Sequence, residues 1–458
     1  MRPMRQELPV SRKGALVCAF VAAAMLLGGG GSPSARPEII VQLGFAGAAF
    51  LWFAWAMRED ASYKSVPREV WVIAALALGL PLLQLIPLPP AVWQALPGRE
   101  AQVAALTAIG EEDSWRSLSI APHVTFAALM ALIPVVGSML AVTQIGLRAR
   151  TALLVTIVVV TLAGAALGVL QMAGGPDDFR IYERSHRGWL VAFHANRNAA
   201  ADVFLIGSLA MTAWTMERVH RYGLSPTRLG ILASVQAVLL AALLMTGSRA
   251  GIVLGLVVLS VNLAMMRRPG VVLDTKKLAM AGAGVLAMLA AGMAWLVTST
   301  RVSQVAERFD TDRDFRSELW TDGWSAATSF FPFGSGIGSF PEAFLPHERL
   351  SVIDQLFPNR AHNDYLEFLI EAGILAPLVL ALGAICLVLL LRRAWSAGGV
   401  ARSHLYFAGG TLLVLALHSI VDYPLRNMAL AVLGGVAVGI LGAHAAPGPD
   451  TQDTGADE

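Results

Sequence analysis

A histidine followed by regularly spaced acidic residues stands out in an otherwise apolar chain. His362 begins the stretch HNDYLEFLIEAG, in which Asp364, Glu367 and Glu371 recur at spacings of three and four residues. On a helix these carboxylates share one face, and Asp364 with Glu367 has the spacing of a capping box. At the positive end of that helix, His362 favours its neutral form, which is the state that a general base needs. The stretch therefore predicts acid–base chemistry at the start of a helix.

Two arginines and a second histidine with a nearby aspartate are the other candidates for chemistry. They lie in the stretches FHANRNAAAD (Arg197), MTGSRAG (Arg249) and HSIVDYP (His418 and Asp422). Arginine binds phosphate or carboxylate groups through two parallel hydrogen bonds and keeps its charge. Each of these residues alone is equally compatible with a helix-end anchor at a membrane surface. These residues indicate a functional site only if folding brings them to one face of the protein.

The composition requires membrane-spanning helices to position these residues. Of the 458 residues, 56% are hydrophobic and only 14% are charged, whereas about 25% are charged in an ordinary soluble domain. A soluble fold has too little interior to hide that much apolar surface. The net charge of +2 provides no basic surface for nucleic acid, and Cys18 and Cys386 lie in apolar runs that predict neither a disulfide nor a metal site. We predict an all-α, polytopic integral membrane protein.

Hydropathy predicts about 12 transmembrane helices and one long loop before the tenth of them. The spans are expected at about residues 14–29, 39–57, 70–87, 123–143, 151–173, 199–216, 229–245, 250–266, 278–298, 364–391, 404–420 and 427–443. The chain is thereby divided into helices 1–9 (1–298), a long loop with an amphipathic helix near 313–331 (299–363), helices 10–12 (364–443) and an acidic tail expected to be disordered (444–458). Because the first span follows a basic stretch, a cleaved signal peptide is the alternative to a retained helix.

The distribution of basic residues predicts the orientation. With the N-terminus in the cytoplasm, the cytoplasmic segments carry 19 Lys and Arg, the short segments on the other side carry 9, and the long loop carries 6. The positive-inside rule therefore places both termini in the cytoplasm. This orientation brings Arg197, Arg249, His362, His418 and Asp422 to the opposite face. Ionisable residues at a membrane interface are costly, so five of them on one face predict a functional site there.

Seven stretches resemble the O-antigen ligase and O-antigen polymerase superfamily of bacterial envelope glycan enzymes, over about residues 70–440. They are LQLIPLPPAVWQAL (83–96), LSIAPHVTFAAL (118–129), FHANRNAAADVFL (193–205), TGSRAGIVLGL (246–256), FPFGSGIGSF (331–340), AHNDYLEFLIEAG (361–373) and HSIVDYPLRN (418–427). The most specific is the His-Asn start with Gly373 eleven residues after His362, and the SRAG turn is next. The chain departs from the pattern at Ala376, where a second glycine is common.

The resemblance implies metal-independent, inverting glycosyl transfer without a cofactor, at the periplasmic face of the bacterial inner membrane. It implies a glycan on undecaprenyl diphosphate as the donor. The acceptor is either lipid A-core, in a ligase, or another lipid-linked glycan, in a polymerase, and both serve the assembly of surface polysaccharide, O-antigen or exopolysaccharide. The sequence also lacks a phosphate-loop motif, which agrees with a donor that carries its own activated leaving group.

The same resemblance assigns roles to individual residues. His362 is expected to act as the base, and Arg197 and Arg249 are expected to clamp the leaving diphosphate. Further residues are expected to bind or orient substrate: Asn363, Asp364, Glu371, His418 and Asp422. The alternative from another functional class is a transporter or flippase for polysaccharide or a small anion, which would place its polar groups near the membrane midplane.

Overall fold

The computed structural model describes residues 10–31, 35–58, 63–175, 177–267, 316–353, 358–396 and 401–446. Within these ranges the chain is almost entirely helical, and one small antiparallel ladder pairs β1 (Pro87–Leu88) with β2 (Arg116–Ser117). The prediction of an all-α protein is confirmed. The predicted span at 278–298 and most of the predicted acidic tail lie outside the described residues.

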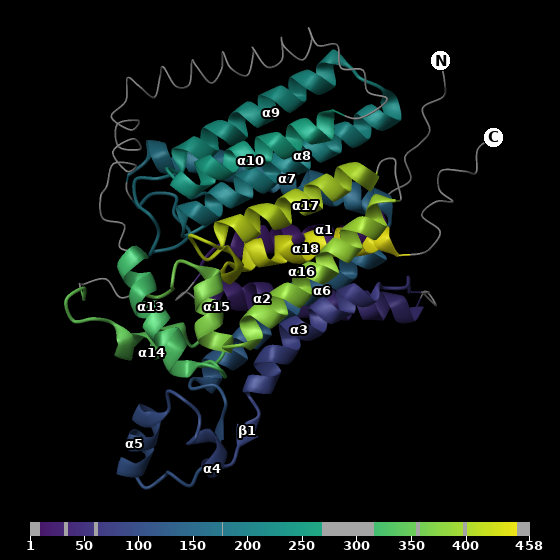
Figure 1. Ribbon diagram of the computed structural model, residues 1–458. Helices are drawn as coiled ribbons and strands as arrows, with labels where there is room; N and C mark the ends of the chain where they lie inside the picture. Colours follow the sequence, from purple (N-terminus) through teal and green to yellow (C-terminus); the bar gives the residue numbers. More distant parts are fainter. Residues whose placement is uncertain are drawn as a thin grey trace.

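Eight helices of the described chain are long and apolar enough to cross a membrane. They are α2 (Ala35–Arg58), α6 (Pro122–Gln144), α7 (Leu147–Ala173), α8 (Arg197–Tyr222), α9 (Pro226–Met245), α10 (Arg249–Met266), α16 (Leu375–Trp395) and α18 (Met428–Ala445). Three further helices, α1 (Arg12–Leu27), α3 (Arg68–Gln84) and α17 (Ala401–His418), run in the same bundle (Figure 1). The polytopic membrane fold is confirmed, while the number of 12 spans stays a prediction.

Helix α8 lies at the centre of one half of the bundle. It packs against α7, α9, α10 and α17, and nearly all of its apolar segment is buried inside the protein. Small residues in its first turns, such as Ala200 and Ala201, are completely buried. Small side chains let membrane helices approach closely and gain packing contacts. In the other half, α18 packs along α6.

Several short helices gather at one end of the bundle (Figure 1). They are α13 (Arg316–Phe330), α14 (Phe340–Phe344), η1 (Leu345–His347), α15 (Asp364–Ala372) and η2 (Pro424–Arg426), with α4 (Pro90–Trp93) and α5 (Glu100–Ala108) projecting beyond them. We call the end that holds α15 and η2 the site end. Helix α13 covers most of the amphipathic helix predicted near 313–331, and its apolar face, including Leu319 and Phe330, packs in a buried cluster with α15.

The structure divides the tenth predicted span, 364–391, into two separate helices. Helix α15 ends at Ala372 and α16 begins at Leu375. Between them Gly373 takes a left-handed φ of 55°, and a Cβ there would lie 2.1 Å from the carbonyl oxygen of Pro332. Only glycine fits this conformation and this contact. The acidic residues of the stretch therefore belong to a short helix at the site end, and the spanning helix starts after them.

Candidate active site

His362 directly precedes Asn363, the residue that caps α15, and has a left-handed backbone conformation, with φ 49°. A residue with a Cβ reaches this conformation at a cost of about 1–2 kcal/mol, so its neighbours must hold it in place. The carbonyl oxygen of Ala361 accepts a hydrogen bond of 3.0 Å from Nε1 of Trp320. On the other side, the amide of Asp364 donates to the carbonyl oxygen of Ser419 at 2.9 Å. Strained residues that are fixed in this way cluster at functional sites.

The imidazole of His362 is paired with a buried carboxylate. Its Nδ1 lies 3.1 Å from Oδ1 of Asp422, a residue 60 positions later in the chain. Oδ2 of Asp422 accepts hydrogen bonds from the side-chain amides of Asn198 at 2.5 Å and Asn196 at 3.4 Å. Burial raises the pKa of Asp422, but the hydrogen bond and the charge of His362 outweigh it and hold that pKa well below its usual range. An ionised Asp422 accepts the Nδ1 proton of a neutral imidazole and thereby leaves Nε2 as the basic nitrogen.

A cavity of about 650 Å³ brings His362 together with both predicted arginines. Arg197 is the first residue of α8, which Asn196 caps, and Arg249 is the first residue of α10, which Ser248 caps. The N-terminus of a helix attracts anions through its unpaired backbone amides and its dipole. Nε of Arg197 is buried and has no hydrogen-bond partner among the described residues. Two helix starts and two guanidinium groups together favour a ligand with several negative charges.

The cavity lining also includes residues that the sequence did not single out, among them Arg316 and Trp189. Arg316 stands at the start of α13, and with Arg187 it brings the number of arginines in the lining to four. The ring of Trp189 lies 5.3 Å from the guanidinium of Arg197. Trp189 also lies against Gly247, where φ is 60° and a Cβ would be 2.3 Å from a ring carbon, so this turn requires glycine. No local spacing indicates either residue, because Trp189 lies in an irregular segment and Arg316 has no other candidate residue beside it.

Arg426 gathers the three carboxylates of α15. Its Nη2 lies 2.5 Å from Oε2 of Glu371, and its Nε lies 3.3 Å from Oε1 of Glu367 and 3.8 Å from Oδ1 of Asp364. Arg360 adds a contact of 2.8 Å to Oε1 of Glu367. The prediction that the three acidic residues share one helix face is confirmed.

Burial controls the protonation of this acidic cluster. It raises the pKa of Asp364 to about 7, although the charge of Arg426 opposes the shift. It likewise raises the pKa of Glu371 to about 7, against the charge of the same arginine. For Glu367 the charges of Arg426 and Arg360 outweigh burial, and the pKa is lowered. The cluster can therefore gain or lose protons near neutral pH while Glu367 stays ionised.

Other predicted residues have structural partners. Asn363 caps α15 by accepting hydrogen bonds from the amides of Tyr365 and Leu366, so the expectation that Asp364 is the cap is wrong. The side chain of His418 is 1% exposed, and its Nδ1 lies 2.6 Å from Oδ1 of Asp202 on α8. Neither Asn363 nor His418 is among the residues that line the His362 cavity.

These features define a multi-pass helical membrane protein with a histidine–carboxylate pair and several arginines around one cavity. Residues 234–381 match a family model described as O-antigen ligase. The match includes Arg249, Arg316 and His362, and it confirms the resemblance to the O-antigen ligase and polymerase superfamily. It supports glycan transfer of the ligase or polymerase type in general. No curated protein matches the chain.

Proposed function

We propose that the protein is a glycosyltransferase at the periplasmic face of the bacterial inner membrane, with both termini in the cytoplasm. It transfers a glycan from undecaprenyl diphosphate to a sugar hydroxyl of an acceptor. The observation that carries this proposal is the cavity in which His362, oriented by Asp422, lies with Arg197 and Arg249. The match to the O-antigen ligase family agrees with it in reaction type.

In the proposed reaction the acceptor hydroxyl gives its proton to Nε2 of His362 while its oxygen attacks C1 of the donor sugar. The bond from C1 to the diphosphate oxygen breaks, and the electron pair leaves with the diphosphate. Attack from the face opposite the leaving group inverts the configuration at C1. A positioned general base contributes typically about 10²- to 10⁴-fold to such a rate.

The arginines act on the leaving group. Negative charge on the departing oxygen grows in the transition state, so a fixed positive charge there stabilises the transition state more than the bound substrate. The backbones of Arg197 and Arg249 are fixed near the cavity because each residue begins a capped helix. Asp422 is a positioning residue, since it acts on the substrate only through the imidazole of His362.

The proposal is tested by replacing His362 with asparagine and, in a second variant, with alanine. Asparagine tolerates a left-handed backbone better than most residues, so His362→Asn removes the base with little change in local conformation. We expect glycan transfer to fall by about 10²-fold or more in both variants, at unchanged abundance in the membrane. His123→Asn is the matched control, because His123 is exposed at the start of α6 and does not line the cavity.

The outcomes separate the possible functions. Wild-type transfer by His362→Asn would overturn the assignment. Solute uptake by reconstituted vesicles without glycan transfer would instead support a polysaccharide flippase or an anion carrier. In cells that lack the protein, loss of long chains with a single repeat retained indicates a polymerase. Accumulation of polymer on its lipid carrier indicates a ligase that uses lipid A-core.

A further inference from the structure

A second cavity, of about 720 Å³, lies on the other side of the segment 360–364, which carries His362. His362 lines the first cavity, whereas its neighbours Arg360 and Asp364 line the second. The segment after α17 also faces both cavities. Asp422 contacts His362 on the side of the first cavity, and Arg426 lines the second cavity. The two short segments therefore form a thin wall between the two cavities.

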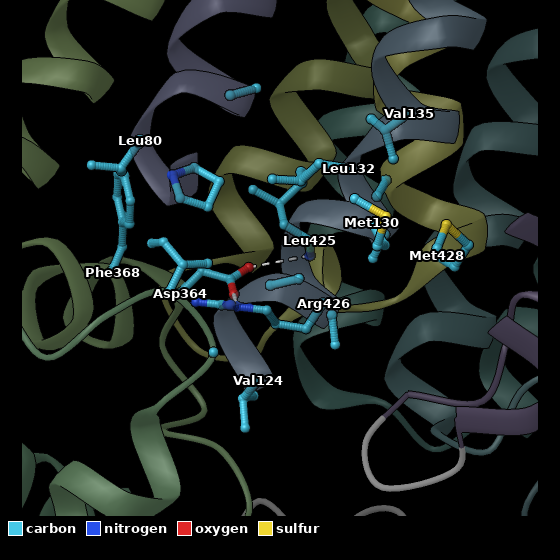
Figure 2. A pocket seen from close by; sticks show the side chains of 18 of the residues that line it. Leu80, Val124, Met130, Leu132, Val135, Asp364, Phe368, Leu425, Arg426 and Met428 are labelled. Carbon is cyan, nitrogen blue, oxygen red and sulfur yellow. Dashed lines mark hydrogen bonds and ion pairs between the residues drawn. The ribbon is translucent and has the colours of Figure 1, made fainter. Parts of the chain in front are cut away.

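The walls of the second cavity are mostly apolar side chains of α2, α3, α6, α16 and α18. Figure 2 shows Leu80 and Phe368 on one side of the cavity and Met130 and Val135 on the other. The lining residues of α6 extend from Val124 to Val135. At about 1.5 Å per residue this is roughly 16 Å, or about half of the roughly 30 Å hydrocarbon core of a bilayer. The cavity is therefore long and runs along a spanning helix.

The charged groups of this cavity are confined to the site end. Glu38 comes from the first turn of α2, and Arg360, Asp364 and Arg426 come from the wall. Figure 2 shows the carboxylate of Asp364 beside the guanidinium of Arg426, where it also accepts a hydrogen bond of 3.2 Å from the amide of Leu425. An apolar groove with a polar end fits an amphiphile whose hydrocarbon chain lies along α6 and whose head lies at the site end.

The two cavities differ in their attraction for a diphosphate. In the second cavity Arg426 and Arg360 already contact the carboxylates of α15. The first cavity is lined by four arginines and three acidic residues, whereas the second has two of each. In the first cavity, Nε of Arg197 is buried and has no hydrogen-bond partner within the described chain, and two helix starts add to the positive potential. The leaving diphosphate therefore fits the first cavity, and the second is left for the other substrate.

We propose that the second cavity binds the polyprenyl chain of a lipid-linked acceptor. This inference rests on the proposed function and makes its substrates two glycans on polyprenyl carriers. A groove of about 720 Å³ that runs along one helix suits part of a single hydrocarbon chain better than the several acyl chains of lipid A. The acceptor glycan reaches His362 around the wall at the site end, so the protein joins two lipid-linked glycans.

Photolabelling of the full-length protein in lipid nanodiscs tests this binding site. The probe is undecaprenyl phosphate with a diazirine in its chain, and labelling is measured on α6 peptides. Ala131→Trp places an indole in the cavity and should lower this labelling on the order of tenfold. Ala384→Trp is the control, because Ala384 is exposed on α16 and does not line the cavity. Leu380→Trp narrows the cavity from α16 and is used where Ala131→Trp lowers the amount of folded protein.

Competition identifies the occupant. Unlabelled undecaprenyl phosphate should displace the probe from α6, whereas phosphatidylglycerol and lipid A should not. In transfer assays Ala131→Trp should raise KM for the acceptor and leave KM for the donor unchanged. Labelling of α6 that survives both tryptophan substitutions, or that is displaced by phosphatidylglycerol or lipid A alone, would overturn the inference.

The test also distinguishes this inference from the proposed function. His362→Asn should lower transfer by about 10²-fold or more and keep the labelling of α6. If α6 is not labelled while His362→Asn is inactive, the acceptor site is refuted and the proposed function stands. If His362→Asn transfers glycan normally, the proposed function fails whatever the labelling shows.

Discussion

Replacing Asp422 with asparagine should inactivate the site while keeping its shape. The two side chains have nearly the same size, so the change lies in the charge and in the position of the hydrogens. Asn198 and Asn196 both donate to the oxygen of Asp422 that faces them, at 2.5 and 3.4 Å. These donors draw the carbonyl oxygen of the new amide to their side, which turns its NH₂ group toward Nδ1 of His362.

An NH₂ group in that position requires Nδ1 to accept a hydrogen bond. The proton of the imidazole then resides on Nε2, and the nitrogen proposed to act as the base is blocked. Loss of general-base catalysis costs typically about 10²- to 10⁴-fold in rate, or about 3–5 kcal/mol of transition-state stabilisation. We expect kcat to fall by this factor while KM for the donor stays close to the wild-type value.

A second substitution should restore the orientation of the amide. In the Asp422→Asn background, Asn198→Asp provides a carboxylate that accepts from the NH₂ group and frees the carbonyl oxygen for the Nδ1 proton of His362. The double variant should recover about tenfold or more in kcat, measured in single-turnover transfer with purified lipid-linked substrates. Wild-type kcat in Asp422→Asn, or a double variant no faster than the single one, would refute this account of the pair.

Three further predictions concern the arginines, the acidic helix and the break after it. Arg197→Gln and Arg249→Gln should each lower the initial rate of transfer by about 10²- to 10³-fold, and a loss below tenfold in both would exclude a diphosphate clamp. Burial raises the pKa of Asp364 to about 7 in the folded protein, above the value near 4 of an unfolded chain. The stability that Asp364 contributes is therefore present below about pH 4 and lost as the pH rises to about 7. Asp364→Asn should accordingly flatten the fall in Tm between about pH 4 and 7, and an unchanged slope would contradict the shift. Gly373→Ala should lower Tm because Gly373 has a left-handed φ of 55°. The control is Gly383→Ala in α16, where a Cβ meets nothing within 4 Å, and it should leave Tm equal or higher. Equal effects of the two substitutions on Tm would argue against a strained turn at Gly373.

Hydropathy predicted several of the spanning helices close to their observed positions. The span expected at 123–143 corresponds to α6, and the span at 229–245 corresponds to α9. These positions follow from local changes in residue type at the helix ends. Hydropathy alone does not predict the break at Gly373, because the apolar residues on both sides of it extend the predicted span at 364–391. It depends on a contact with Pro332, which only the folded chain provides.

The sequence predicted which residues belong to the site better than it predicted which side chains contact each other. Arg197 and Arg249 follow residues that cap helices, so their place at helix starts is a local property. The pairing of His362 with Asp422 joins residues 60 positions apart, and no spacing rule predicts it. Arg426 likewise contacts the carboxylates of α15 only because folding brings η2 next to that helix.

The separation of α15 from α16 has a consequence for how the protein responds to its lipid surroundings. Spanning helices tilt when the bilayer becomes thicker or thinner. Helix α15 is held by the turn at 331–336, where the amides of Ser335 and Gly336 donate to the carbonyl oxygens of Ile370 and Glu371 at 3.0 and 2.9 Å. Because α15 and α16 are separate helices, we expect a tilt of α16 to leave α15 and His362 in place. The protein should work at similar rates in bilayers of different acyl-chain length.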